Sequence, residues 1–234
     1  MFFNTISKFF LFIGLISTII ITIDLFRHPQ KEMPIMNLVW PINGLWAGVF
    51  GLWAYFTIGK YRKMNMDMDM DMDMNMDMNM DMSSNKYSKF WQGVVADTLH
   101  CGAGCTLADL IGSWIFFFFP FSIFQNLTFG EWTLEYILAL ITGVTFQYAA
   151  ISPMMKEKGI KVWLTALKID FLSLTAWQVG MYGWMAIIIF VFLGRLSPTT
   201  PEFWFMMQIA MCFGFLTAYP VNWWLVKKGI KMGM

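Results

Sequence analysis

Long apolar stretches with few charges dominate this sequence and restrict what it can fold into. A helix needs roughly 20 mostly apolar residues to cross the hydrocarbon core of a bilayer. Six such stretches occur, at residues 8–26, 37–59, 90–119, 132–151, 161–194 and 203–226. Only 13% of the residues are charged, whereas a typical soluble domain has about 25%. The sequence therefore predicts an all-α, multi-pass protein of the cell (inner) membrane with about six transmembrane helices.

Basic residues gather in alternate loops, which predicts how the helices are oriented. Lys and Arg favour the cytoplasmic ends of spans. They follow the second, fourth and sixth stretches, at Lys60, Arg62, Lys63, Lys156, Lys158, Lys161, Lys227, Lys228 and Lys231. With six spans, both termini are then expected in the cytoplasm. Arg27 and Lys31 disagree with this orientation, because they follow the first stretch, at the end that it places outside.

Between the second and third stretches, Met alternates with Asp or Asn. The ten Met residues are Met64, Met66, Met68, Met70, Met72, Met74, Met76, Met78, Met80 and Met82. Asp and Asn disfavour strands, and the carboxylates repel one another. We therefore expect residues 61–89 to be a disordered cytoplasmic linker between an N-terminal helix pair, residues 1–60, and a four-helix membrane domain, residues 90–234.

The Met repeat has two interpretations. One is a low-complexity expansion without a task. The other is capture of a soft metal ion, because thioether sulfur is a neutral, soft ligand that selects Cu(I). In that case the Asp side chains keep the tract in water and raise the local concentration of cations.

The third stretch carries a stripe of chemically active residues: Asp97, Cys101, Cys105 and Asp109. Four helical residues turn about 400°, so the stripe occupies a sector of about 120°. His100 borders it. Ionisable groups at membrane depth are costly and usually face the bundle interior. We interpret His100, Cys101 and Cys105 as metal ligands and the two Asp residues as an ion or proton relay, although a buried Cys is also a common packing residue.

Two later stretches carry Met pairs at a spacing of four, Met181 with Met185 and Met207 with Met211. Such a pair resembles the filter motif of the eukaryotic high-affinity copper-uptake channels, although Met at helical spacing is more often used for packing. The four residues extend the predicted sulfur path from the cysteines. Asp170 is a further expensive charge and a third candidate for the relay.

These residues favour a membrane protein that binds or transports Cu(I) or Ag(I), or assists their transport, and Cu(I) is the one cofactor expected. No Gly-x4-Gly-Lys motif for phosphate binding is present, so transport is expected to be passive or coupled to an ion gradient. The net charge of +1 gives no reason to expect nucleic acid as a partner. No catalytic residue is assigned, and a non-enzymatic role is favoured.

Three alternatives stay open. The first is a structural or assembly partner in a membrane complex, as a homo-oligomer or with another membrane protein. The second is a thiol oxidoreductase using Cys101 and Cys105, whose spacing differs from Cys-x-x-Cys. The third is a b-type haem protein, for which only His28 and His100 are available as imidazole ligands.

Five longer segments resemble one family: HCGAGCTLAD, FQYAAISPM, SLTAWQVGMYGWMA, FWFMMQIAM and YPVNWWLVKKGIK. They are similar to an uncharacterised bacterial integral-membrane family, catalogued as a domain of unknown function. The resemblance covers roughly residues 90–234, and residues 1–60 resemble a helix pair that often precedes it. It implies a polytopic membrane protein and supplies no established activity.

Overall fold

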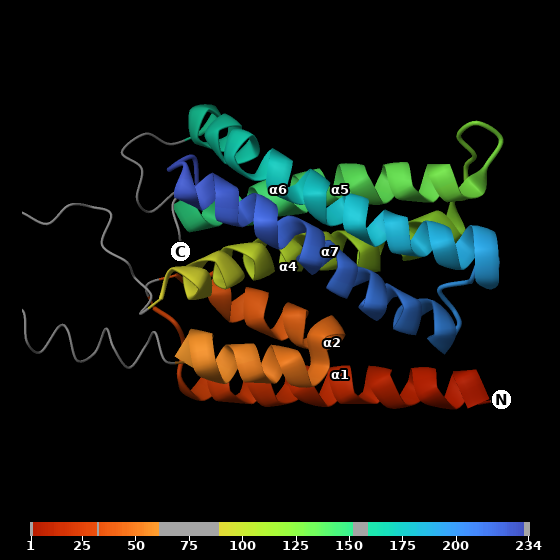
Figure 1. Ribbon diagram of the computed structural model, residues 1–234, viewed down its shortest axis with the longest axis horizontal. Helices are drawn as coiled ribbons and strands as arrows, with labels where there is room; N and C mark the ends of the chain where they lie inside the picture. The colour runs from red at the N-terminus through yellow and green to blue at the C-terminus, as the bar shows by residue number, and fades with distance from the viewer. Residues whose placement is uncertain (1, 32, 61–88, 152–158, 232–234) are drawn as a thin grey trace, which may run out of the picture.

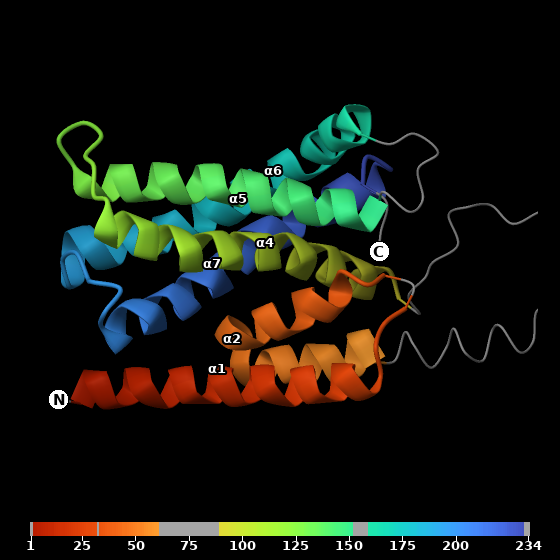
Figure 2. The same cartoon turned by 180° about the vertical axis from the view of Figure 1, so that it is seen from behind.

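The computed structural model describes residues 2–31, 33–60, 89–151 and 159–231, which form a bundle of long helices running roughly along one axis (Figures 1 and 2). In chain order the elements are α1 (Phe2–Arg27), α2 (Met36–Ala54), η1 (Tyr55–Gly59), α4 (Phe90–Phe118), α5 (Leu127–Ile151), α6 (Ile160–Ile187), η3 (Ile188–Phe192) and α7 (Pro201–Lys227). The described residues contain no strand, so the all-α prediction is confirmed.

Five helices in the described part of the chain are long and apolar enough to cross a membrane. They are α1, α4, α5, α6 with its continuation η3, and α7. Large apolar side chains stand exposed on their outer faces, for example Phe12, Ile141 and Leu216. Exposed apolar surface on this scale is typical of a protein that lies in lipid. The multi-pass membrane prediction is therefore supported by both the helices and their surfaces.

The second predicted span, residues 37–59, is a helical hairpin instead of a straight crossing. Gly48 has φ 52° and ψ −124°, a conformation that side-chain-bearing residues avoid. On a straight helix Trp40 and Tyr55 would lie about 22 Å apart, yet their ring centroids are 5.6 Å apart. The two halves are antiparallel, so the hairpin begins and ends at the same end of the bundle (Figure 1).

Asp24, near the end of α1, holds the returning half of the hairpin. Its carboxylate accepts a 2.7 Å hydrogen bond from Tyr55 Oη and pairs with Lys60 Nζ at 3.0 Å. On a straight second span, Lys60 would lie at the opposite end of the bundle from Asp24. Pro41 lies within the first half of the hairpin and does not end the helix, because the chain turns at Gly48. The carbonyl of Pro41 accepts a hydrogen bond from Thr18 Oγ1 at 3.0 Å.

The hairpin reduces the candidate membrane crossings among the described residues from six to five. The start of α1 and the end of α7 lie at opposite ends of the bundle (Figure 1). An odd number of crossings would place the two termini on opposite sides of the membrane, whereas the sequence predicts both in the cytoplasm. The physical reason is the turn at Gly48, which returns the chain to the side from which it came.

The same hairpin resolves the disagreement over Arg27 and Lys31. Both now lie at the end of the bundle where η1 ends, α4 begins and α7 ends (Figure 1). This end of the bundle is called the basic end. All of the 16 Lys and Arg residues except Lys8 and Arg195 belong either to this end or to chain segments that connect helices ending there. By the positive-inside rule the basic end is expected in the cytoplasm.

Glycine at the centre of α4 lets two helices approach closely. A Cβ atom on Gly104 would lie 2.8 Å from the Cα atom of Gly143 on α5, too close for any side chain. Thr142 Oγ1 donates a 2.8 Å hydrogen bond to the Gly104 carbonyl across this contact. Small residues allow such packing in membranes, where the hydrophobic effect does not drive helices together.

We predict that the amino terminus lies outside the cell and the first loop inside. A membrane-impermeant thiol reagent added to intact cells should label Phe2→Cys but not Gln30→Cys, in a background without Cys212. Thr199→Cys, in the loop before α7, is the positive control, because both topologies place it outside. Labelling of Gln30→Cys with protection of Phe2→Cys would instead support six crossings.

We also predict that Gly104→Ala lowers the stability of the protein by about 1–3 kcal/mol, because the methyl group overpacks the α4–α5 contact. Gly183→Ala on α6 is the matched control. Nothing lies within 4 Å of the Cβ position at Gly183, so that change should be neutral or stabilising by up to about 1 kcal/mol. Thermal unfolding in detergent measures both, and equal midpoints would contradict the packing argument.

Candidate functional site

The stripe predicted on the third stretch is buried inside the bundle. Asp97, Cys101 and Cys105 are fully buried on α4, and Asp109 is 1% exposed. Both cysteines are free thiols. The indole of Trp177 on α6 packs directly over Gly102, which has no side chain to keep it away. All four positions of the stripe therefore face protein, as the cost of charge at membrane depth requires.

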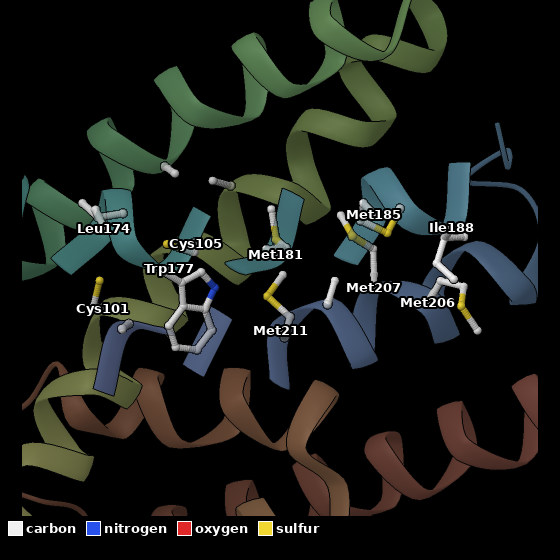
Figure 3. Close-up of a cluster of buried hydrophobic side chains, with 14 of the residues drawn as sticks. Cys101, Cys105, Leu174, Trp177, Met181, Met185, Ile188, Met206, Met207 and Met211 are labelled. Atoms are coloured by element: carbon white, nitrogen blue, oxygen red, sulfur yellow. The ribbon is translucent and has the colours of Figure 1, made fainter. Parts of the chain in front are cut away.

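Sulfur atoms from three helices gather in one buried cluster. Its sulfur-bearing members include all six predicted positions outside the Met tract, Cys101, Cys105, Met181, Met185, Met207 and Met211. Figure 3 shows them in a row along the core between α4, α6 and α7, with the Trp177 indole beside Cys105. Thr106 Oγ1 lies 3.7 Å from Met211 Sδ. The structure thus brings the cysteines and both Met pairs into a shared core.

His100 takes a different direction from the sulfur row. It is fully buried and packs against Phe146 of α5, with ring centroids 6.1 Å apart. Across the described ranges, no three His, Cys, Asp or Glu side chains form a group that could hold a metal ion. His100, Cys101 and Cys105 therefore do not make a preformed three-ligand site. The predicted ligands Met64–Met82 lie outside the described residues.

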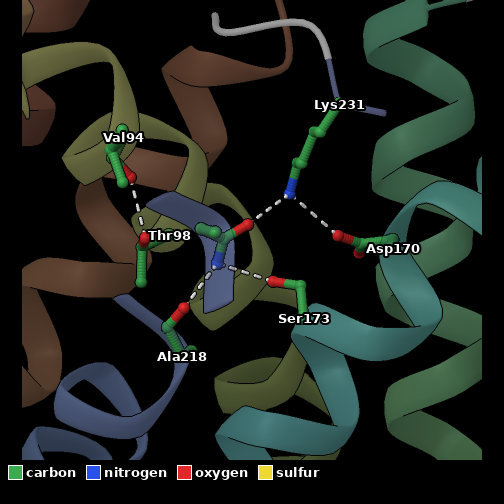
Figure 4. A network of polar contacts seen from close by, with 7 residues as sticks. Val94, Thr98, Asp170, Ser173, Ala218 and Lys231 are labelled. Atoms are coloured by element: carbon green, nitrogen blue, oxygen red, sulfur yellow. Dashed lines mark hydrogen bonds and ion pairs between the residues drawn. The ribbon is translucent and has the colours of Figure 1, made fainter. Parts of the chain in front are cut away.

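A buried ion pair closes the basic end of the core (Figure 4). Lys231 Nζ lies 3.1 Å from Asp170 Oδ1, and both side chains are fully buried. Lys231 also donates to Asn222 Oδ1 at 3.1 Å, and Asn222 Nδ2 donates to Ser173 Oγ at 2.7 Å. This network joins α6, α7 and the segment after α7, where Gly229 at φ 69° turns the chain back.

The charge of Lys231 is maintained by its neighbours. Burial alone would lower the pKa of Lys231, but the carboxylates of Asp170 and Asp97 outweigh it and hold the pKa above its ordinary value. The side chain is therefore an ammonium at neutral pH. Asp170, the third relay candidate, is thus the partner of a tethered cation, and Asp97 lies close enough to interact with the same charge.

At the opposite end of the core, two glutamates of α5 join the polar residues. Glu131 Oε2 lies 3.0 Å from Arg195 Nη2, and the Arg195 guanidinium stacks over the ring of Phe116 at 4.9 Å. Ser113 Oγ donates a 2.8 Å hydrogen bond to Glu135 Oε1. Glu135 is 2% exposed. Buried acidic side chains are therefore present on α5 as well as on α4.

Asp109 occupies the middle of this series, and the Gln178 side chain of α6 lies within hydrogen-bonding reach of its carboxyl group. Among the described residues, neither carboxyl oxygen of Asp109 and neither polar atom of that carboxamide has a well-aligned hydrogen bond. Glu135 lies within electrostatic range of Asp109. Unpaired buried polar groups are rare and often mark functional positions.

Acidic groups outnumber basic ones in this core. Five carboxyl side chains are buried in the part of the 90–231 region that the structure describes, Asp97, Asp109, Glu131, Glu135 and Asp170. Lys231 and Arg195 face them as basic partners. From Asp97 to Ser113 the series extends about 24 Å along α4, most of the roughly 30 Å hydrocarbon thickness. An arrangement of this kind favours cations over anions.

Two cavities bring sulfur and carboxyl groups together. The outer crevice, of about 10 Å³, is lined by Glu131, Glu135, Met181, Met185 and Met207 among others. The hairpin cavity, of about 250 Å³, lies between α1, α2, α4 and α7, and its lining includes Leu45, Thr106, Asp109, Met207, Gln208 and Met211. Met207 lines both cavities.

Several residues of this core were not predicted as site residues from the sequence. Glu131 was assigned to a loop, Glu135 was not singled out, and Lys231 was used only as a topological charge. One signal was available: Glu131 and Glu135 are four residues apart, so a helix extended by one turn places both on one face. Nothing in the sequence indicated that Lys231 would turn back to pair with Asp170.

The family comparison agrees with the resemblance found in the sequence. A family model described as Domain of unknown function (DUF4396) matches residues 90–231, which include α4 to α7 and Lys231. No curated protein and no solved structure matches the chain. Because the matched segment covers more than half of its length, the chain belongs to this family of unknown function.

Proposed function

We propose that this chain moves a soft monovalent metal ion, Cu(I) or Ag(I), across the cell (inner) membrane. The observation that carries the proposal is the row of thiol and thioether side chains in one buried cluster. Soft sulfur ligands of this kind select Cu(I) over the hard ions that prefer oxygen. Three helices contribute to the row, so a small shift of one helix changes which sulfur atoms face one another.

Acidic side chains next to the sulfur support a cation as the cargo. Met207 and Met211 line the hairpin cavity together with Asp109, and Met207 also lines the outer crevice with Glu135. A neutral thioether leaves the charge of the metal uncompensated. A nearby carboxylate reduces the cost of holding that charge in a low-dielectric core.

The Met/Asp tract has a suitable position in the chain for collecting metal. It connects η1 with α4, and both of these helices meet the basic end of the bundle. With that end in the cytoplasm, Met64–Met82 would gather metal ions beside the Asp170–Lys231 end of the core. Their thioethers would then deliver ions toward Cys101 on α4.

The alternatives gain less support from the geometry. A redox-active thiol needs to be reached by its partner, whereas Cys101 and Cys105 are fully buried. A structural role in a larger complex would favour one apolar face, but large exposed apolar side chains are spread over all five crossing helices, as expected for contact with lipid.

Removing the Met tract should lower the metal-binding capacity of the purified protein. The tract has ten thioethers, and about three sulfur atoms bind one ion. Deletion of residues 64–82 should therefore remove on the order of three Ag(I) ions per chain, while a smaller number of ions stays bound to the transmembrane helices. Equilibrium dialysis with Ag(I) measures this. A tract with every Met changed to Leu and every Asp kept is the control, and unchanged binding by that variant would assign the ions to carboxylates.

The double variant Met207→Leu with Met211→Leu should slow Ag(I) flux into proteoliposomes by about tenfold or more, which corresponds to about 1.4 kcal/mol. Leu conserves most of the volume of Met, so the packing cost is small. Met206→Leu is the matched control, because Met206 lies in the same buried cluster but is not among the lining residues of either cavity. Equal losses in both variants would indicate packing instead of metal contact.

A further inference from the structure

The α2–η1 hairpin extends only part of the way along the bundle and leaves a space beyond its tip. The chain turns at Gly48, and the tip meets the middle of α1, where Gly14 has no side chain to separate it from the Leu45 carbonyl. Beyond this contact α1 packs on α7, where the rings of Phe10 and Phe205 stack at 5.2 Å. The hairpin cavity, of about 250 Å³, is bordered by the tip and by both of these helices.

The lining of this cavity is almost wholly apolar, because its polar side chains make their hydrogen bonds within the protein. Trp204 Nε1 donates to the Pro198 carbonyl at 2.7 Å, and Gln208 Nε2 donates to the Leu45 carbonyl at 2.7 Å. The carboxyl oxygens of Asp109 are buried and do not reach the cavity surface. An apolar cavity of about 150 Å³ in a protein interior stays dry yet takes up a small hydrocarbon. The chemistry of the lining therefore fits hydrocarbon and not water or an ion.

The mouth of the cavity faces the lipid. Leu15 of α1 and Leu110 of α4 line the cavity, and they are 51% and 40% exposed on the outer surface of the bundle. The cavity is bordered by the first halves of α1 and α7, which lie on the side away from the basic end (Figure 1). Hydrocarbon of the leaflet away from the basic end therefore has direct access to it.

A cation stands at the headgroup side of the mouth. Lys8 is exposed on α1 and precedes Leu15 by seven residues, so the two side chains share one helix face and are about 10 Å apart along the axis. Glu202 on α7, which accepts a 2.7 Å hydrogen bond from Asn4, lies within electrostatic range of Lys8. Lys8 is therefore on the α7 side of α1, above the cavity. An ammonium has three donors, so an exposed one has room for a second anion.

We propose that the hairpin cavity binds one acyl chain of a phospholipid from the leaflet away from the basic end, with the lipid phosphate at Lys8. The separation of about 10 Å between Lys8 and Leu15 fits within one leaflet, whose hydrocarbon is roughly 15 Å deep. The long apolar stem of a lysine lets its ammonium reach headgroup level. A phospholipid is the occupant because it carries both the hydrocarbon that the cavity takes and the anion that Lys8 attracts.

Native mass spectrometry of the full chain tests this site. After purification in mild detergent and washing to remove loosely held lipid, one phospholipid per chain should stay bound. Leu15→Trp places a larger side chain at the mouth and should remove that lipid. Ile19→Trp is the matched control, because Ile19 is 48% exposed on the same helix but is not among the lining residues.

Thermal unfolding gives a second readout and a second variant. Phosphatidylglycerol added to the delipidated chain in detergent should raise the unfolding midpoint in a saturable way, because a ligand that binds the folded state stabilises it. Thr106→Phe should abolish this shift, because Thr106 lines the cavity and is only 7% exposed, so a phenyl ring there occupies the space of the acyl chain.

The phosphate contact has its own test. Lys8→Gln should weaken phosphatidylglycerol binding about fivefold, as expected for one basic residue beside an anionic lipid. Arg27→Gln, at the other end of α1, is the control and should leave binding unchanged. A chain that retains no phospholipid, or one whose lipid survives both Leu15→Trp and Thr106→Phe, would overturn the site. Equal affinity in Lys8→Gln and the parent would overturn the phosphate contact. None of these results depends on Ag(I) flux.

Discussion

The cost of charge in a low-dielectric core organises the α4–α7 half of this protein. Asp170 is fully buried on α6, and a carboxylate there needs a counter-charge. Lys231 provides it by turning back into the bundle after the end of α7. Arg195 does the same for Glu131 at the other end. These two pairs leave Asp109 between them with no basic partner among the described residues, and the neutral Gln178 side chain is its polar neighbour.

The hairpin at Gly48 is the second constraint, and it acts on both topology and chemistry. By returning the chain to the basic end, it places Arg27 and Lys31 beside the other basic segments. By ending a helix in the middle of the bundle, it also lets the Leu45 carbonyl accept a hydrogen bond from Gln208 Nε2 on α7. A straight span would not have placed Arg27 and Lys31 at the same end as the other basic segments.

Some of this arrangement was predictable, and the reasons are local. A spacing of four on a helix fixes a common face, so the stripe from Asp97 to Asp109 and the two Met pairs were correctly expected in the interior. Burial of the stripe followed from its charge. His100 is adjacent to Cys101 in sequence, but neighbours on a helix point in different directions, and its ring packs against Phe146; its role as a metal ligand stays a prediction.

The sequence by itself determined that the chain is helical, lies in a membrane and buries its sulfur and carboxyl groups, because hydropathy and helical periodicity are properties of short segments. Only the tertiary structure decided that residues 36–59 turn back, that Lys231 pairs with Asp170, and that Met207 shares a cavity with Asp109. A turn at Gly48 is one of several conformations open to glycine, and pairs far apart in sequence are selected by how whole helices pack. Such choices depend on the energy of the complete bundle and leave no local pattern.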